Sequence, residues 1–479
     1  MARGRDPKNN RVDSDTRIAQ CGHAVSLLRA RRQRRASLVI MGCIGVLALV
    51  MIARATAADL TAGPANYREV VGKLRAGDTL RLASGIYRHG LDIHGLEGSI
   101  GAPIEVRGAR SPGRAVFVAA PGRNTVSIAN SAHVKIADLD LVGGELPVDA
   151  VKAEGTSRYA HHITLEGLRI TGHGADQQNV AISTKCPAWG WTIRGNAIIG
   201  AGTGLYLGNS DGSAPFIRGL IERNIIIGTR GYSMQIKHQM PWPDLPEIAS
   251  DPGDTIVRYN TFAKDERSST GDLARPNLLL GHWPLAGKGS RERYLVYGNL
   301  FLDNPAEVLL QAEGNVTVYN NVFINRFGDA VAIREHNDVP RSIDFFHNTI
   351  VARGVGVLLR NGDPAAKQTI SGNAIFADQV TPPSVASQNL LSRFERAGNA
   401  GRNAAGTPPP VDLAAAGRSV DDRQWNAAGR EDLPDVALDF DHQRRMRPVY
   451  GAYAGVLPAD SRRLDAAERE RGSNRLPRP

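Results

Sequence analysis

The sequence predicts a right-handed parallel β-helix, a solenoid in which short strands stack from one coil to the next. A β-rich run that ends in an asparagine, one further residue and an apolar residue returns seven times between residues 150 and 375. The steps are 28, 36, 39, 22, 27 and 25 residues, and the asparagines are Asn196, Asn224, Asn260, Asn299, Asn321, Asn348 and Asn373. Repeats of this length indicate stacked units that cannot bury their apolar faces alone.

Each repeat holds short β-rich runs without a long helix, so we expect about ten coils with an asparagine at the same bend of each. Asparagine suits a bend because it tolerates left-handed backbone angles and bonds nearby backbone groups. The low aromatic content, 6%, and the 51 glycines fit a core of small stacked aliphatic side chains.

Residues 1–57 form the first predicted segment. The basic run RRQRR at 31–35 precedes an apolar stretch at 36–53, and Ala55-Thr56-Ala57 places small residues at cleavage spacing. This pattern predicts a secretory signal peptide. The alternative is a single membrane anchor, because 18 apolar residues are borderline for spanning a bilayer. Either way we expect the bulk of the chain to be secreted or periplasmic, with membrane contact only if this segment stays uncleaved.

The net charge of +10 comes largely from that segment. It carries 11 of the 58 basic residues and 3 of the 48 acidic ones, so the remainder is close to neutral and gives little support for nucleic-acid binding. Among three cysteines only Cys186 follows residue 57, so we expect a buried structural thiol and no intramolecular disulfide after cleavage.

The β-helix is predicted over residues 58–380. Residues 66–76 have apolar residues at helical spacing, and a short helix there would cap the open end of the stack. Two insertions, 239–254 and 264–276, account for the longest steps and are expected to be loops that carry functional residues. Residues 381–458 are expected to form an irregular closing segment, and 459–479 a disordered tail.

Three stretches together resemble a known family. GDTLRLASGIY near the start, the N-x-[IF] coils, and the closing DFD…R…GAY are similar to bacterial β-helix proteins of the pectate-lyase-like superfamily, over residues 66–453. The resemblance implies the fold. That superfamily includes polysaccharide lyases, uronan epimerases, glycoside hydrolases and non-enzymatic proteins, so it does not select one activity.

One outward column of side chains is the candidate functional face. The second strand of each coil was aligned on its two apolar positions, which should point inward, so that the fifth position points outward. That column reads Lys152, Ser183, Gly208, Lys237, Gly281, Gln311, Arg334 and Arg360. Four cations and no acid suit an anionic polymer, and the glycines would leave room for it. The alternative is a solvated basic face with glutamate partners.

Histidines and tryptophans cluster just beyond this column. Trp242 and Trp283 are predicted platforms for sugar rings, and the alternative is that they cover strand ends. Arg267, in the second insertion, would fold over a bound chain. The predicted substrate-binding set is therefore Lys152, Trp242, Trp283, Gln311, Arg360 and Arg267.

β-Elimination on a uronate needs a base at C5, a cation on the carboxylate and an acid at the leaving oxygen. A lysine among cations has a lowered pKa, so Lys237 is the predicted base, with His238 and His282 as rivals. Arg334 and Arg360 would hold the carboxylate. Reprotonation from the other face would give C5 epimerisation. The predicted catalytic set is Lys237, His238, His282, Arg334, Glu335 and His336.

Within the resemblance, IREHND at 333–338 is similar to the L-R-H-G-N stretch of alginate and chondroitin lyases with this fold, and Arg334 matches their catalytic arginine. Two features depart from that pattern. Glu335 separates the arginine from the histidine, and Lys237 lies three coils back rather than one. Those lyases also bind calcium through an Asn/Glu/Glu set, for which Glu307 and Glu313 are the candidates here, so Ca²⁺ is the one cofactor considered.

Other chemistries have weaker support. Gly172-His173-Gly174 and the QIK at 235–237 resemble pieces of polygalacturonases, but hydrolysis needs paired carboxylates that these coils lack. His161-His162 could be a metal pair, but no Cys or carboxylate spacing supports it. We therefore predict an exported monomer that binds an acidic polysaccharide as a lyase or C5-epimerase. The alternatives are a non-catalytic polysaccharide-binding or envelope scaffold protein, and then a glycoside hydrolase.

Overall fold

The computed structural model describes residues 57–109, 113–155, 159–245, 248, 252–397, 430–446 and 450–453. The predicted signal peptide or anchor before residue 57, the charged tail 459–479 and part of the closing segment lie outside these residues. Nowhere in the described part is there a helix of the length and apolarity needed to cross a bilayer.

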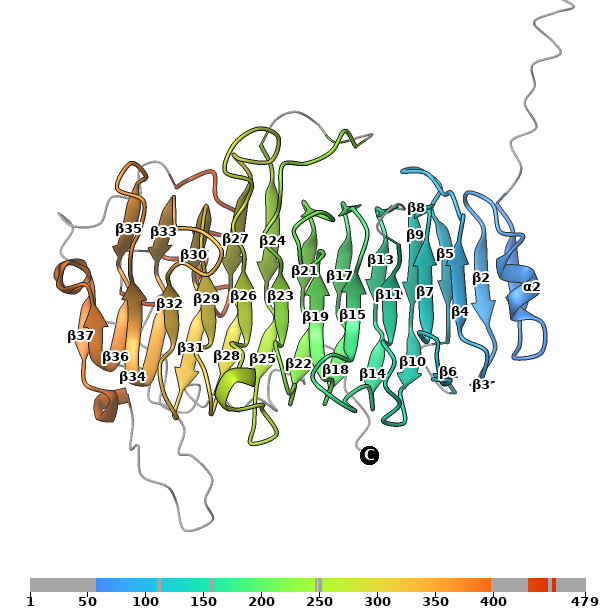
Figure 1. The fold of residues 1–479 in the computed structure, drawn as a ribbon, viewed down its shortest axis with the longest axis horizontal. Coiled ribbons are helices and arrows are strands. Elements are labelled where there is room, and N and C mark those ends of the chain that lie inside the picture. The colour runs from blue at the N-terminus through green and yellow to red at the C-terminus, as the bar shows by residue number, and fades with distance from the viewer. Residues whose placement is uncertain are drawn as a thin grey trace, which may run out of the picture. The chain divides into compact units, whose positions relative to one another are not determined.

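The predicted parallel β-helix is confirmed. Every strand pairing between named strands is parallel, and each coil contributes one strand to each of several ladders that run along the stack (Figure 1). The first ladder has twelve strands among the described residues, slightly more than the ten coils expected. These are β1 (Asp59–Ala62), β2 (Thr79–Leu82), β5 (Ile104–Arg107), β9 (Val134–Ala137), β13 (Thr164–Glu166), β17 (Thr192–Arg194), β21 (Leu220–Glu222), β24 (Asp254–Arg258), β27 (Arg293–Tyr297), β30 (Val316–Tyr319), β33 (Ile343–Phe346) and β35 (Gln368–Ser371).

A second ladder follows the asparagine bend of each coil. It consists of β3 (Gly85–Tyr87), β6 (Ala115–Val118), β10 (Leu139–Val142), β14 (Arg169–Thr171), β18 (Ala197–Ile199), β22 (Ile225–Ile227), β25 (Thr261–Ala263), β28 (Leu300–Leu302), β31 (Val322–Asn325), β34 (Thr349–Leu359), β36 (Ala374–Thr381) and β37 (Leu390–Ser392).

The third ladder carries the predicted functional column. Its strands are β4 (Leu91–His94), β7 (Val126–Ala129), β11 (Val151–Ala153), β15 (Val180–Thr184), β19 (Thr203–Leu207), β23 (Met234–Ile236), β26 (Leu278–Leu280), β29 (Leu310–Ala312) and β32 (Val331–Ile333), and it joins the second ladder through the long β34. A small fourth sheet holds β8 (Ser131–Ala132), β12 (Ala160–His161), β16 (Ala188–Trp189) and β20 (Phe216–Ile217).

The inward side chains form one continuous core because the same position of each coil stacks on its neighbour. Phe262, Phe301 and Phe323 show this: their rings stack in sequence with centroids 5.0 and 4.6 Å apart. Cys186 lies in the same core, and burial raises the pKa of its thiol to about 12, so the prediction of a buried thiol is confirmed.

The seven asparagines form a buried ladder, with Asn389 as an eighth member. In each step the side-chain amide and the backbone N–H of one asparagine donate to Oδ1 of the next; between Asn224 and Asn260 these distances are 2.9 and 3.0 Å. The expected left-handed angle belongs to the residue before the asparagine, for example Arg223 at φ 55° and Tyr259 at φ 58°. The asparagine is therefore selected because its amide both donates and accepts along the stack, and not for its backbone angle.

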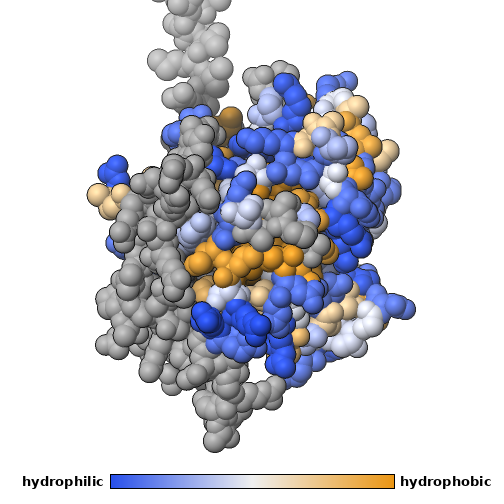
Figure 2. Space-filling view, turned by 90° about the vertical axis from the view of Figure 1, so that its left-hand side faces the viewer, coloured by the Kyte–Doolittle hydropathy of each residue, from blue (hydrophilic) through white to orange (hydrophobic). Residues whose placement is uncertain are grey.

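The N-terminal end carries the expected helix in a shorter form, α2 (Tyr67–Val71), whose Tyr67 and Val71 face the core. The far end holds two 3₁₀ turns beside β36, η2 (Pro383–Gln388) with six residues and η3 (Phe394–Ala397) with four. A three-residue turn, η1 (Gly271–Leu273), lies in the second insertion. Figure 2 views the end where β37 lies, and apolar residues form a band across it between hydrophilic ones.

The described part of the closing segment packs along the flank of the stack. Phe440, Ala452 and Tyr453 join an apolar cluster with residues of the second ladder, and Leu433 joins another with Tyr297 and Tyr319. Among their described residues, the two predicted insertions contain no strand except at Asp254, where β24 begins.

Candidate functional site

The observed register of the third ladder corrects the predicted column. Ile182 pairs with Leu205 and Leu280 with Ala312, so Lys185 and Glu313, two residues beyond the expected Ser183 and Gln311, align with the others. Lys152 pairs with Ser183, so Glu154 takes the place expected for Lys152. The outward strip, defined as the aligned residues from β11 to β34, reads Glu154, Lys185, Gly208, Lys237, Gly281, Glu313, Arg334 and Arg360. The strip therefore contains two acids, and the expectation of a column without acids is wrong.

The expected role of the glycines is also wrong. A Cβ on Gly281 would lie 2.3 Å from the backbone N of His238, and a Cβ on Gly208 would lie 3.2 Å from Cβ of Lys237. The space beside each glycine is filled by the neighbouring coil. These glycines allow adjacent coils to approach closely, and they leave no room there for a ligand.

A groove of about 390 Å³ opens beside the first half of the strip, over β15, β19 and β23. Half of its polar lining side chains are cationic or phenolic, and most of the rest are neutral amides and hydroxyls. The lining includes Lys152, Lys185, Lys237, Arg275, Tyr206 and Tyr232, together with the carboxylate of Asp149. The groove thus brings two predicted residues, Lys152 and Lys237, together with cations from two other segments.

Lys185 and Tyr206 form the floor of this groove. The Lys185 ammonium lies 3.5 Å from the centroid of the Tyr206 ring. The pKa of Lys185 is lowered to about 8, chiefly by burial, with Asp149 opposing the change and Lys152 and Lys237 contributing to it. Burial in turn raises the pKa of Asp149, whose Oδ1 accepts from the Val180 N–H at 2.8 Å. The site therefore concentrates positive charge where solvent is restricted.

Lys237 lies at the centre of the cationic region. It is half-buried, and burial together with Arg275 lowers its pKa, while Glu313 raises it. Its ammonium is 5.8 Å from the Tyr206 ring centroid, and the Tyr206 hydroxyl bonds Ser210 Oγ at 2.9 Å. Arg275 lies at the end of the second insertion, 5.8 Å from the Tyr232 ring centroid. A lysine with a lowered pKa beside a phenol is a chemically competent base and acid pair.

Three predicted histidines continue the site along the strip. The His238 and His282 rings are 5.5 Å apart. Nδ1 of His282 lies 2.8 Å from the Trp283 carbonyl. Because a carbonyl can only accept, Nδ1 is the donor, and in the neutral ring Nε2 is then an acceptor. Burial, Lys237 and His282 lower the pKa of His238. His336 remains exposed, yet partial desolvation lowers its pKa, with Glu313 opposing and Lys237 and Arg334 adding to the effect.

Glu313 anchors this part of the site. Its carboxylate is completely buried and accepts from the backbone N–H groups of His282 at 2.9 Å, His336 at 2.6 Å and Asp338 at 2.8 Å, and also from that of Asn337. These contacts join two coils and hold the loop after Arg334. Both carboxylate oxygens face N–H donors, which is the environment of a structural anion and is a poor match to the predicted calcium ligand.

The two remaining predicted catalytic residues, Arg334 and Glu335, contact different partners. Arg334 is partly exposed and lies 3.9 Å from Glu307, which places the second predicted calcium ligand in an ion pair. Glu335 turns toward the next coil, where it accepts from Asn361 Nδ2 at 2.7 Å and lies 3.8 Å from Arg360. Its backbone N–H and Asn361 hold the pKa of Glu335 below its usual value, so it is a poor proton donor.

Five of the six predicted substrate-binding residues, all but Lys152, are not among the described residues that line the groove. Gln311 is buried within β29, and Trp283 is fully buried, stacked on Tyr294 at 4.3 Å, so neither can meet a sugar ring. Arg267 is held by Asp265 at 2.6 Å in the second insertion, against the bends at Gly200 and Gly228. The alternative, in which the tryptophans cover the core, fits Trp189 and Trp191 as well, since both are buried.

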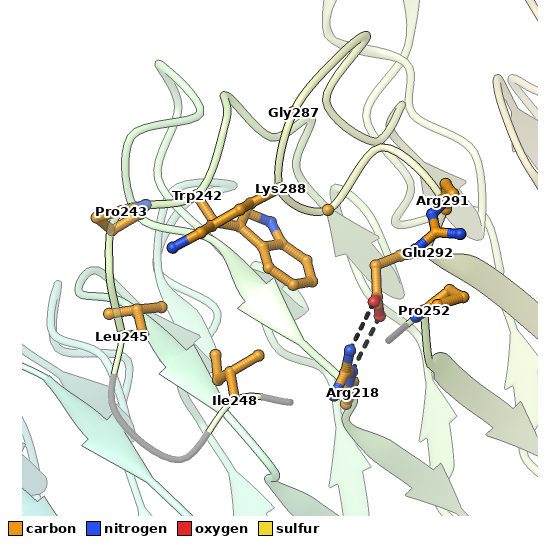
Figure 3. Close-up of a pocket in the computed structure, with 11 residues that line it drawn as sticks. Arg218, Trp242, Pro243, Leu245, Ile248, Pro252, Gly287, Lys288, Arg291 and Glu292 are labelled. Atoms are coloured by element: carbon orange, nitrogen blue, oxygen red, sulfur yellow. Dashed lines mark hydrogen bonds and ion pairs between the residues drawn. The ribbon is translucent and has the colours of Figure 1, made fainter. Parts of the chain in front are cut away.

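Trp242 lines a different cavity, of about 310 Å³, formed by the first insertion and residues 287–292 (Figure 3). The indole is 8% exposed and donates from Nε1 to Gln239 at 2.8 Å. On the opposite wall Arg218 pairs with Glu292 at 2.9 Å. This cavity shares no lining residue with the cationic groove.

Sequence reasoning missed Lys185, Tyr206, Tyr232, Arg275 and Asp149. Lys185 ends the segment NVAISTK and was visible there, but a two-residue slip of the alignment assigned Ser183 to its position. Arg275 lies within the second insertion, and no periodicity extends through such a loop.

No family model and no curated protein matches the chain, whereas several solved structures do. An alginate lyase from Paenibacillus sp. str. FPU-7 has 16% identity and a TM-score of 0.45, covering 68% of this chain and 99% of its own. A GH136 lacto-N-biosidase from Eubacterium ramulus has 11% identity and a TM-score of 0.41, with 76% and 70% covered. The pectate lyase Bsp165PelA from Bacillus sp. N165 has 11% identity and a TM-score of 0.34, with 70% and 91% covered. The likeness is a distant one of fold.

Proposed function

We propose that this chain binds an anionic, uronate-containing polysaccharide in the groove over β15, β19 and β23, and acts on it by β-elimination or C5 epimerisation. The observation that supports this most is the concentration of Lys152, Lys185, Lys237 and Arg275 with two phenols in an open groove. A solvent-restricted site in which cations outnumber acids attracts a polyanion, and fixed cations stabilise the charge that develops on a uronate carboxylate.

The roles follow from the geometry. Arg275 and Lys185 would pair with the uronate carboxylate, which makes the C5 proton more acidic. Neutral Lys237 would remove that proton, because burial and Arg275 favour its uncharged form. The Tyr206 hydroxyl would then protonate the departing O4 in elimination, whereas protonation of C5 from the other face would give the epimer. Arg334 and His336 would bind the next sugar units along the strip.

Hydrolysis has less support. It requires two carboxyl groups at a set separation. Asp149 is the one carboxylate among the described residues that line the groove, and His173, from the motif similar to polygalacturonases, is fully buried with Nδ1 bonded to the Val148 carbonyl at 3.0 Å. Binding without catalysis is the remaining alternative, and the cation–π contact of Lys185, which favours a charged ammonium, is consistent with it.

The test uses the exported form of the chain and a panel of polyuronates and glycosaminoglycans, with and without Ca²⁺. Elimination creates an unsaturated uronate that absorbs in the ultraviolet, and epimerisation changes the proton spectrum of the polymer without it. We expect product from one member of the panel and its loss, by a hundredfold or more, in Lys237→Met, in line with removal of a general base. The chain's location is tested by cell fractionation.

Lys73→Met is the matched control, because Lys73 is an exposed lysine just after α2 at the N-terminal end of the stack, paired with Glu69. It should keep full activity. Binding of a polyuronate without product, abolished by Lys185→Met together with Arg275→Met, would instead establish the binding protein. Neither binding nor product with any polyanion would refute the proposal.

A further inference from the structure

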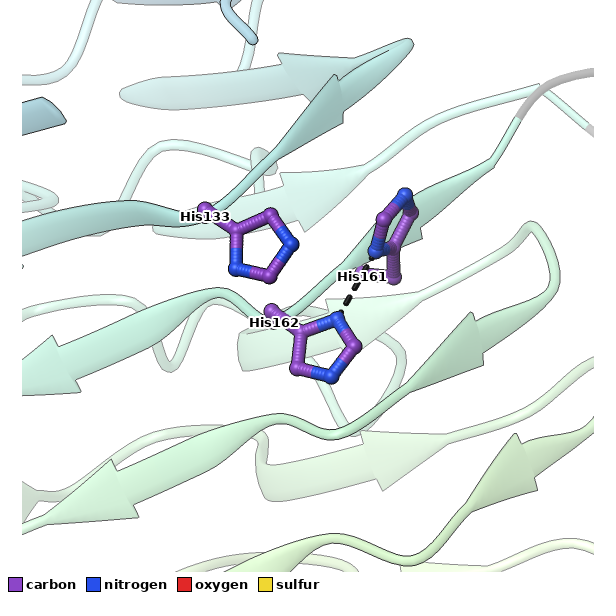
Figure 4. A group of neighbouring side chains, drawn as sticks. All are labelled: His133, His161 and His162. Carbon is purple, nitrogen blue, oxygen red and sulfur yellow. Dashed lines mark hydrogen bonds between the residues drawn. The ribbon is translucent and has the colours of Figure 1, made fainter. Parts of the chain in front are cut away.

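The fourth sheet brings three histidines together, on a part of the stack that the proposed function does not use. His133 follows β8, His161 ends β12, and His162 comes next (Figure 4). Each offers one ring nitrogen, and these three atoms lie within 4.8 Å of one another. In the described part of the chain this is the one group of three or more potential ligands at such distances.

The register explains how residues from two coils meet. His161 pairs with Ala132 on one side and with Trp189 on the other, so His162 aligns with His133 and Gly190. The His133 and His162 rings stack, with centroids 4.4 Å apart and planes 10° from parallel. Stacking of equivalent side chains on successive coils accounts for this pair by itself.

This stacking does not explain the orientation of the His161 ring. Its ring is turned across the pair, at 79° to His162 and 82° to His133, and its Nδ1 lies 2.8 Å from Nδ1 of His162. Two imidazole nitrogens can face each other at this distance only if one of them carries no proton. The two nitrogens share one proton in a hydrogen bond, and a metal ion that replaced this proton would meet a lone pair from each ring.

The surroundings hold these rings in place. His161 is 6% exposed and stacks on Trp189 at 4.3 Å, with planes 6° apart. The His162 ring lies over Gly190, where a Cβ would come within 2.7 Å of its Cδ2. A ligand set fixed by packing loses little conformational entropy on binding, as good metal sites require.

We propose that His133, His161 and His162 bind one divalent transition-metal ion of the zinc, nickel and copper class. Three imidazoles without carboxylates suit these borderline ions and do not suit Ca²⁺ or Mg²⁺, which prefer oxygen. Nitrogens around a tetrahedral Zn²⁺ lie about 3.4 Å apart, given Zn–N bonds near 2.0–2.1 Å. Small ring rotations reach this spacing, and water would complete the coordination. The ion would join two coils of the stack.

The left-handed backbone at two of the ligands provides unusually clean variants. His133 and His162 have φ of 52° and 50°, and Gly190 occupies the equivalent position of the next coil at φ 65°. Glycine adopts this conformation without strain, so His133→Gly and His162→Gly should fold normally. The control variant is His94→Gln. His94 is an exposed histidine bonded to Ser127, and because it lies in a strand, glutamine replaces it better than glycine would.

The experiment measures Zn²⁺ bound per full-length chain by equilibrium dialysis, and the thermal unfolding midpoint with and without Zn²⁺. Histidine and cysteine residues elsewhere can also bind zinc, so the quantity that matters is the difference between variants. We expect His133→Gly and His162→Gly each to lose one zinc, or at least tenfold in its affinity, and to lose the zinc-induced rise of the midpoint. His94→Gln should lose neither.

Cobalt substitution provides an independent readout, because Co²⁺ in a tetrahedral nitrogen site has a characteristic visible absorption that the glycine variants should lack. Zinc binding and midpoint shifts that are the same in wild type, His133→Gly and His162→Gly would overturn the proposal, as would the absence of any zinc bound to the wild type. Activity on polysaccharide is not part of this test, so its outcome is independent of the proposed function.

Discussion

The ammonium of Lys185 lies over the face of the Tyr206 ring, 3.5 Å from its centroid, although the two residues belong to successive coils. Ile182 pairs with Leu205, and this register places the lysine one step beyond the last strand pair and the tyrosine within it. The contact links the two coils at the floor of the cationic groove. A cation–π pair in this setting stabilises a charge that burial alone would disfavour.

Lys185 should make stability depend on alkaline pH. Its pKa is lowered from 10.5 to about 8 by burial, so between these values the unfolded chain binds a proton that the folded chain has released. Stability therefore rises with pH across this window, and below pH 8 the folded state bears the full cost of the buried charge. Denaturant unfolding should show a smaller rise between pH 8 and 10.5 in Lys185→Met than in wild type.

Other buried lysines titrate as well, so the comparison between proteins carries the result. Lys73→Met, on an exposed lysine, should reproduce the wild-type slope. Equal slopes for Lys185→Met and wild type would show that the cation–π contact cancels the effect of burial on this lysine.

Removing the negative charge of Glu313 should lower the pKa of the groups around it. Glu313 raises the pKa of Lys237 and opposes the lowering at His238 and His336. In Glu313→Gln we expect each of these pKa values to fall, because a carboxylate no longer stabilises the protonated form. NMR titration of the histidine ring protons measures the two histidines directly.

The same change should loosen the loop at 336–338, since four backbone N–H groups lose a charged acceptor. Amide exchange at these residues should become faster. Asp338→Asn is the control, because Asp338 bonds the Glu313 carboxylate through its backbone N–H and not through its side chain. Unchanged histidine titration in Glu313→Gln would contradict the arrangement of charges described here.

Breaking the asparagine ladder in its middle should destabilise the whole stack. Asn260 accepts at Oδ1 from both N–H groups of Asn224 and donates to Asn299, all in the core. Asn260→Ala leaves buried donors without an acceptor, which costs about 2–4 kcal/mol of unfolding free energy. Asn260→Asp should be at least as damaging, because a carboxylate faces the Asn299 oxygen. Asn209→Ala, on an exposed loop, should cost about 0.5 kcal/mol or less.

Gly281 should tolerate no side chain. A Cβ there would lie 2.3 Å from N and 2.8 Å from Cα of His238, and these backbone atoms cannot move without displacing Lys237. We expect Gly281→Ala to cost about 1–3 kcal/mol of stability, as overpacking does, and to reduce activity together with it. Gly328→Ala is the control, since nothing lies within 4 Å of its Cβ position. Thermal unfolding of both variants decides the point, and equal midpoints would argue against close packing at Gly281.

The sequence by itself determined the solenoid, its direction of stacking and the asparagine ladder. These features repeat in every coil, so each repeat supports the others, and the amide of asparagine is the group that both donates and accepts along such a stack. The capping helix, the loops at the two insertions and the buried cysteine were also accessible, because each depends on a local pattern of apolar or polar residues.

Only the tertiary structure decided which side chains share the groove. Side chains alternate with a period of two, so a slip of two residues between coils preserves every inward and outward assignment and leaves no trace in the pattern. This is why the predicted column contains Lys152, Ser183 and Gln311 where Glu154, Lys185 and Glu313 stand. Arg275 and the histidine cluster depend on how loops return to the stack, and hydrogen bonding between distant coils fixes that return after the local pattern has ended.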